Sequence, residues 1–235
     1  MKTKNNNPNS NLYLLAGYIV FYMIFHHLIP KGGILQGSSL LYFQCTSYIV
    51  LGIIGLYLSG KEFVKGFICW QKHFSRNLLW LTGAFAAEML LSNIAAIPSY
   101  LLHSENLGGN TEGIEAAFRL LPLPLIILAL GVMGPIVEEV VFRITLIYFP
   151  IEKIKKHSEQ QMRWVVIVCL TISSLGFMLI HVRTMDLIGI TDTLPQFATG
   201  IIFAITYYKT KNITIPVIIH ILNNSLSLFV SGISL

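Results

Sequence analysis

The sequence has few charged residues. Only 11% of its 235 residues are Asp, Glu, Lys or Arg, whereas 54% are hydrophobic and the mean hydropathy is +0.68. A soluble domain usually carries about 25% charged residues. This composition, with long apolar runs between the few charges, excludes an ordinary soluble domain and indicates a protein that spans the membrane.

The sequence also has only three cysteines and no nucleotide-binding motif. Cys45, Cys69 and Cys169 lie in or beside apolar segments, without the spacing of metal ligands or of a disulfide framework. We therefore interpret them as small buried hydrophobic residues. The sequence contains no internal repeat, no low-complexity tract, no P-loop and no GxGxxG motif, so it gives no sign of a solenoid or of a nucleotide site.

Seven apolar segments predict helices that cross the membrane. They cover residues 12–29, 39–59, 77–98, 120–149, 164–182, 194–208 and 213–232. Residues 120–149 are too long for one simple span and too short for two, and Gly134-Pro135 is expected to kink them. The predicted fold class is all-α, a polytopic bundle of about seven transmembrane helices, or eight if residues 120–149 cross twice.

Basic residues gather on one side of this seven-span arrangement. Twelve of the 16 lie there: Lys2, Lys4, Lys61, Lys65, Lys72, Arg76, Lys153, Lys155, Lys156, Arg163, Lys209 and Lys211. Because cytoplasmic loops are enriched in Lys and Arg, we expect the N-terminus inside and the C-terminus outside. The net charge of +5 then reflects topology and attraction to anionic lipid of the bilayer. It does not indicate nucleic-acid binding, because the charges sit in separate short loops.

Three charges interrupt the apolar run GPIVEEVVFR, residues 134–143. A charge at the bilayer centre costs at least about 2.5–3.5 kcal/mol, so these side chains should face protein or a water-filled cavity. Glu139 and Arg143 are four residues apart and can pair on one helical face. Glu138 points about 100° away, without a partner on its own helix, and its burial suits a general base. The alternative is a structural ion-pair cluster that fixes helix packing.

Two further motifs place polar side chains in apolar segments. In FMLIH, Phe177 and His181 share a helical face, although a lone histidine there is more often a core residue than a catalyst. In IPVIIHILNN, His220 and Asn224 also share a face. Two such donors suit a developing oxyanion, but they could equally join helices by hydrogen bonds. Together the motifs predict a site at membrane depth that can activate water and attack an amide.

These motifs carry a resemblance to a known family. EEVVFR, FMLIH and HILNN fit EExxxR, FxxxH and HxxxN in order, and the chain resembles the CPBP family of intramembrane proteases. This family, also called the Abi or CAAX-protease family, is related to the Ras-converting CAAX endopeptidase. The resemblance implies a catalytic core over residues 120–235, with its active site inside the bundle. Residues 1–119 would form N-terminal transmembrane helices without a recognised motif.

The resemblance also implies a role for each motif residue. Glu138, helped by His181, would activate water, and His220 and Asn224 would stabilise the tetrahedral oxyanion. Glu139 and Arg143 would support the site. If zinc is present, its ligands would be Glu138, His181 and His220, but the sequence has no HExxH spacing, so metal-independent glutamate chemistry is favoured.

The implied activity is that of an intramembrane endopeptidase in the bacterial plasma membrane. Its substrate would be a small membrane-associated peptide or protein, and its role bacteriocin self-immunity or maturation of a secreted peptide. The alternatives are a non-catalytic immunity or binding protein with the same fold and, less favoured, a transporter or proton relay. The transporter is disfavoured because the sequence shows no inverted repeat.

Two questions stay open at the level of sequence. Straight spans would put His181 towards the outer end and Glu138 and His220 nearer the inner end. The three groups meet only if helices tilt, kink or begin elsewhere, for example if the fifth begins near Gln160. Glu88, in the third segment, could line the substrate cavity or hydrogen-bond a neighbouring helix.

Overall fold

The computed structural model describes residues 8–25, 35–102, 109–154 and 158–233, and every regular element in these ranges is a helix. The first elements are α1 (Pro8–Met23), α3 (Gly37–Lys72), α4 (Phe74–Leu102) and α5 (Gly109–Leu120). A long central helix follows as α6 (Leu123–Ile126), η2 (Ile127–Met133), α7 (Gly134–Glu139), η3 (Val140–Tyr148) and α8 (Phe149–Ile154). The last are α9 (Glu159–Leu179), α10 (Leu187–Asp192), α11 (Leu194–Thr210) and α12 (Thr214–Ile233). The all-α prediction is confirmed.

Six helical stretches are long and apolar enough to cross a membrane. They are Gly37–Lys72, Phe74–Leu102, Leu123–Ile154, Glu159–Leu179, Leu187–Thr210 and Thr214–Ile233. They match six of the seven predicted spans. The helix α9 begins at Glu159, close to Gln160, where the fifth helix was expected to begin if the motif residues were to lie at the same depth. The first predicted span corresponds to α1, whose apolar part, Leu14–Met23, is shorter. Residues 26–29 of that predicted span lie outside the described residues.

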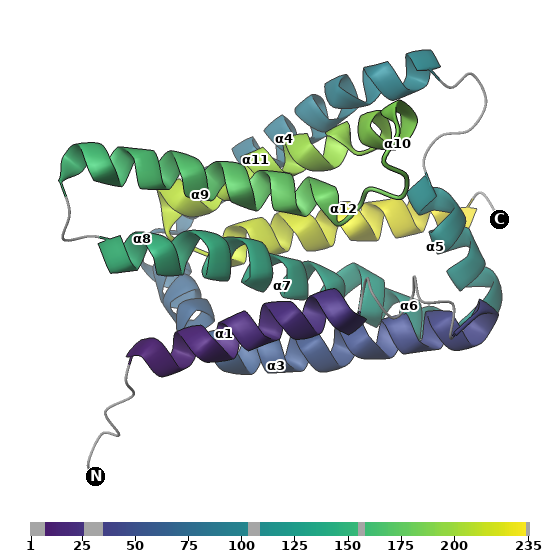
Figure 1. Ribbon diagram of the computed structural model, residues 1–235, viewed down its shortest axis with the longest axis horizontal. Coiled ribbons are helices and arrows are strands. Elements are labelled where there is room, and N and C mark those ends of the chain that lie inside the picture. Colours follow the sequence, from purple (N-terminus) through teal and green to yellow (C-terminus); the bar gives the residue numbers. More distant parts are fainter. Residues whose placement is uncertain (1–7, 26–34, 103–108, 155–157, 234–235) are drawn as a thin grey trace, which may run out of the picture.

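The helices run roughly along the long axis of the molecule, with α1 and α3 side by side at one edge (Figure 1). The helix of residues 123–154 lies at the centre: in its most apolar window 67% of the residues are buried, against 11–39% in the other five spans. It contacts α3 through η2 and α7, α12 through the same two segments, and α9 through η3. This central position explains why its charges do not meet lipid.

Two π-helical segments, η2 and η3, flank the short α7 that carries the two glutamates. At the end of η2 the N–H of Gly134 donates to the carbonyl of Ala129, five residues back. Pro135 has no N–H and cannot continue this series. At Gly134-Pro135, where a kink was expected, the hydrogen bonding changes from π to α.

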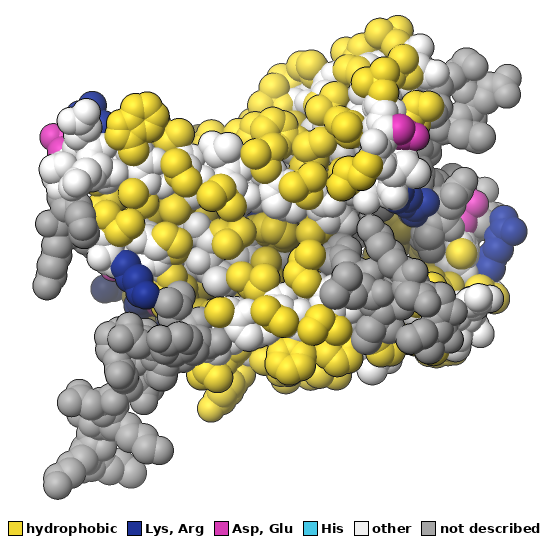
Figure 2. All heavy atoms as spheres, in the orientation of Figure 1, with side chains coloured by type: hydrophobic (Ala, Val, Ile, Leu, Met, Phe, Trp, Pro, Cys, Tyr) yellow, Lys and Arg dark blue, Asp and Glu magenta, His cyan; other side chains and the backbone are white. Residues whose placement is uncertain are grey.

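Hydrophobic side chains cover most of the surface seen in Figure 2, and the visible Lys, Arg, Asp and Glu side chains lie towards the two ends. Large apolar residues such as Tyr57, Leu79 and Phe229 are 86%, 72% and 65% exposed. A soluble protein rarely exposes apolar patches of such extent. This surface is suited to contact with lipid.

Candidate active site

The three motifs meet inside the bundle, around a cavity of about 1030 Å³. Glu138 lies on α7, His220 and Asn224 lie on α12, and His181 follows the end of α9; all four line the cavity. Glu139 and Arg143 lie behind this wall and are completely buried. The difference in depth expected for straight spans therefore does not keep the motif residues apart.

Glu139 and Arg143 form the predicted ion pair. Arg143 Nε lies 3.2 Å from Glu139 Oε2, although the two atoms are not aligned for a hydrogen bond. The guanidinium also faces three aromatic rings, those of Phe142, Phe177 and Phe203, at 5.9, 4.9 and 5.4 Å from their centroids. One carboxylate and three ring faces thus compensate a cation that has no access to water.

His220 lies between the two glutamates. Its Nδ1 is 3.0 Å from Glu139 Oε1, and its Nε2 is 3.7 Å from Glu138 Oε2. The rings of Phe177 and Phe203 pack on the imidazole at 5.6 and 5.3 Å. Glu139 therefore joins Arg143 to His220, and a continuous buried chain of charged and polar groups leads to Glu138 on the cavity wall.

Glu138 has a partner from the N-terminal half of the chain. The hydroxyl of Tyr48, on α3, donates to Glu138 Oε1 at 3.1 Å. This partner lies on another helix and was not predicted from the sequence. The sequence holds only a weak signal for it, since Gln44 and Tyr48 are two polar-tipped residues four apart within an apolar segment. Both line the cavity.

His181 stands apart from the ion-pair chain. Its Nδ1 lies 2.8 Å from the carbonyl oxygen of Phe177, and the two rings are 5.1 Å apart, as their spacing predicted. Because a carbonyl can only accept, Nδ1 carries the proton, and Nε2 of the neutral ring has the lone pair. His181 and Glu138 both line the cavity.

Asn224 is held by the π-helical segment. Its Nδ2 donates to the carbonyl of Leu130 at 3.0 Å. In the π series the donor to that carbonyl would be residue 135, which is proline. Asn224 therefore satisfies an acceptor that the central helix leaves open. An amide nitrogen carries two hydrogens, so a second donor remains for the cavity.

Glu88 belongs to a separate hydrogen-bonded cluster. Thr199 Oγ1 and Asn223 Nδ2 both donate to Glu88 Oε1, at 2.8 and 3.1 Å. Glu88 is 1% exposed and is not one of the cavity-lining residues. The structure thus answers the open question: Glu88 joins α4 to α11 and α12 through Thr199 and Asn223.

The arrangement does not fit a zinc site formed by Glu138, His181 and His220. A zinc ion requires protein nitrogen and oxygen ligands at about 2.0–2.2 Å. Nδ1 of His220 is engaged by Glu139, and Nδ1 of His181 by a backbone carbonyl, which leaves only the two Nε2 atoms for any ligand role. Among the residues that the structure describes, no group of three His, Cys, Asp or Glu side chains could hold a metal ion.

Comparisons with known proteins agree with the motif resemblance. Residues 120–226 match the profile of a family described as type II CAAX prenyl endopeptidase Rce1-like. The region that holds the site belongs to this Rce1-like family. That region contains all six predicted site residues, whereas Tyr48 lies outside it.

Two curated relatives are membrane peptidases by name. The chain is 24% identical to the membrane-embedded CAAX protease MroQ of Staphylococcus aureus (strain USA300), over 91% of this chain and 83% of the relative. It is 26% identical to the membrane peptidase named YdiL of Bacillus subtilis (strain 168), over 63% of this chain and 54% of the relative. No solved structure matches the chain significantly.

Proposed function

We propose that the protein is an intramembrane endopeptidase that hydrolyses a peptide bond in a small membrane-associated peptide or protein. The observation that carries this proposal is the buried chain from Arg143 through Glu139 and His220 to Glu138, which ends on the wall of a cavity. A carboxylate held in this way can accept a proton from water at a place that lipid does not reach. The match to a family described as endopeptidases supports hydrolysis of a peptide bond.

The first step is attack by water. Tyr48 occupies Oε1 of Glu138, so Oε2 is the oxygen that accepts the proton of the attacking water. The new C–O bond forms as the carbonyl π electrons move to oxygen. The second N–H of Asn224 and an N–H at Nε2 of His220 would donate to this oxyanion.

The second step breaks the C–N bond. The proton taken by Glu138 is delivered to the leaving nitrogen, directly or through Nε2 of His181, and the products are a carboxylic acid and an amine. Glu139 orients His220 through Nδ1, and Arg143 balances the charge of Glu139. No metal ion takes part in these steps, and chelators are expected to leave the rate unchanged.

The test compares wild-type protein with Glu138→Gln in detergent, on a library of synthetic apolar peptides with mass spectrometric detection. Glu138→Gln should lower the rate at least about 100-fold, because it removes the base. Glu159→Gln is the control and should keep the wild-type rate, since Glu159 is exposed at the start of α9 and does not line the cavity. Equal rates for wild type and Glu138→Gln, or a loss of activity with chelator, would contradict the mechanism. If Glu138→Gln still protected cells against a bacteriocin to which the wild-type protein gives immunity, the protein would act by binding instead of by cleavage.

A further inference from the structure

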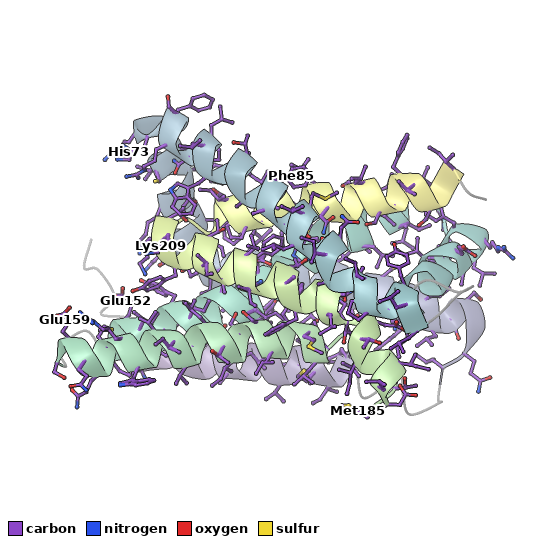
Figure 3. All side chains as sticks on the ribbon, turned by 90° about the horizontal axis from the view of Figure 1, so that it is seen from above. His73, Phe85, Glu152, Glu159, Met185 and Lys209 are labelled. Carbon is purple, nitrogen blue, oxygen red and sulfur yellow. The ribbon has the colours of Figure 1, made fainter. Side chains whose placement is uncertain are left out.

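The cavity extends from the site towards one end of the bundle. Eight of the described basic residues lie at the other end, here called the basic end: Lys61, Lys65, Lys72, Arg76, Lys153, Arg163, Lys209 and Lys211. In Figure 3, His73, Glu152, Glu159 and Lys209 mark the basic end, and Met185 lies at the opposite end. None of the eight basic residues lines the cavity.

The lining residues farthest from Glu138 all lie at the end opposite the basic end. They come from the start of α3, the end of α4, the segment after α9 and the end of α12, and examples are Leu41, Tyr100, Arg183 and Ser231. Tyr100 is 50% exposed, and Arg183 is also exposed. Among the residues that the structure describes, the cavity therefore extends to the exposed surface at this end.

One face of α12 forms a polar track along the cavity. His220, Asn224, Ser227 and Ser231 all line it and are spaced by four, three and four residues, so they share a helical face. Apolar side chains line the cavity on either side of this track: Leu226, Leu228 and Val230. At a rise of 1.5 Å per residue, His220 and Ser231 are about 16 Å apart along the helix. An extended peptide advances about 3.3 Å per residue, so the track matches roughly five residues.

The lining chemistry suits an extended peptide better than a helix. An extended backbone at membrane depth lacks partners for its N–H and C=O groups, and each unmet group costs several kcal/mol. Besides the track, the amides of Gln44, Asn93 and Gln196 line the cavity and can act as such partners. A helical substrate meets its own backbone hydrogen bonds and has no need of these side chains.

We propose that the cavity binds about five residues of an extended peptide that enters from the end opposite the basic end. Since basic loops are cytoplasmic, this entrance faces the outside of the cell. The enzyme then acts on peptides presented at the outer surface of the membrane, not on chain ends offered by the cytoplasm. The hydrolysis rests on the proposed function, whereas the entrance and its orientation do not.

Thiol accessibility tests the entrance without any need for catalysis. The variant Ser231→Cys places a thiol at the opening, and Ser75→Cys places a matched thiol in the exposed first turn of α4 at the basic end. Both are made in a background with Cys45, Cys69 and Cys169 changed to alanine. If that background does not fold, the wild-type background serves, with its own labelling subtracted. In intact cells a membrane-impermeant maleimide should label Ser231→Cys. It should label Ser75→Cys only after the cells have been permeabilised. The reverse pattern overturns the proposed orientation.

Occupancy is tested with a synthetic ten-residue apolar peptide and the Glu138→Gln, Ser231→Cys double variant, which retains the peptide uncleaved. Bound peptide should cause a loss of labelling at Ser231→Cys and none at Ser75→Cys. Unchanged labelling at saturating peptide overturns the peptide track. With Glu138 intact, a bulky maleimide on Ser231→Cys should abolish cleavage. Cleavage that persists after this labelling would contradict the proposed entrance and leave the proposed function standing. Protection of the thiol by peptide, without any cleavage by the wild-type protein, would support the entrance and contradict the proposed function.

Discussion

The hydroxyl of Tyr48 is the contact that the N-terminal half makes with the proposed base. Tyr48→Phe removes the hydrogen bond to Glu138 Oε1 and keeps the ring that lines the cavity. A hydrogen bond to a charged group contributes about 1.5–3 kcal/mol, so kcat should fall about tenfold or more. KM should change little, because the hydroxyl positions the base rather than the peptide. Steady-state kinetics on a cleaved peptide measures both.

Tyr18 supplies the control for this variant. Its hydroxyl is also buried but donates to the backbone carbonyl of Leu51 at 2.9 Å, away from the glutamates. Tyr18→Phe should lower thermal stability slightly and leave kcat unchanged. An equal loss of kcat in both variants would mean that Tyr48 acts through folding alone.

The buried ion pair allows a second prediction at the scale of single residues. Arg143→Met removes the counter-charge of Glu139, and breaking a buried pair from one side costs about 3–5 kcal/mol. The double variant Glu139→Gln, Arg143→Met removes both charges and should recover most of the thermal stability. It should stay inactive, because His220 loses the carboxylate that orients it. Thermal unfolding in detergent, paired with the cleavage assay, separates these outcomes; a double variant less stable than Arg143→Met would contradict the pairing.

At this scale the sequence predicts what lies on one helix and little of what lies between helices. A spacing of four residues predicted the pair of Glu139 with Arg143 and the contact of Phe177 with His181, because helical periodicity alone decides both. Contacts such as Phe203 with Arg143 depend on how far one helix is rotated and shifted against another. No periodicity in the sequence encodes that register, so the aromatic surroundings of Arg143 were not predicted.

At the scale of the helix, the π-helical segment before α7 gives Asn224 two possible roles. Asn224→Ala leaves the carbonyl of Leu130 without its donor, which should cost about 1–3 kcal/mol of stability. Pro135→Ala adds an N–H within reach of the same carbonyl. The double variant Pro135→Ala, Asn224→Ala should therefore recover part of the stability.

Activity in the same variants separates packing from catalysis. If Asn224 donates to the oxyanion, Asn224→Ala should lower kcat at least about 100-fold, as removal of one oxyanion donor does elsewhere. The double variant should then remain equally slow although it is more stable. Recovery of kcat together with the unfolding midpoint would show that Asn224 serves the central helix only.

Hydropathy predicted the long helices, since length and apolarity decide whether a segment crosses a membrane. It did not predict the π segments. These depend on whether each N–H donates to the carbonyl four or five residues back, and hydropathy does not distinguish the two hydrogen bonds. Pro135 indicated where the helix would be irregular, but it did not indicate that the irregularity would be π-helical hydrogen bonding. In the altered register Asn224 donates to the Leu130 carbonyl.

At the scale of the whole molecule, the two halves of the chain share one core. Its buried residues include Leu15, Tyr18 and Leu51 from the N-terminal half, and Val137 and Val140 from the central helix. The division of the chain into residues 1–119 and 120–235 stays a prediction based on sequence motifs. The shared packing indicates that residues 120–235 do not fold stably alone. In addition, they lack Tyr48.

Separate expression of the halves tests this dependence. Residues 120–235 alone should insert but be protease-sensitive and inactive, because the faces of η2 and α7 that contact α3 lose their partner. Transmembrane helices insert first and associate afterwards, so co-expression with residues 1–119 should restore both protease resistance and cleavage. Co-expression with a 1–119 fragment that carries Tyr48→Phe should restore resistance but only slow cleavage. Full activity of residues 120–235 by themselves would show that the family region is complete and that α3 contributes nothing to the base.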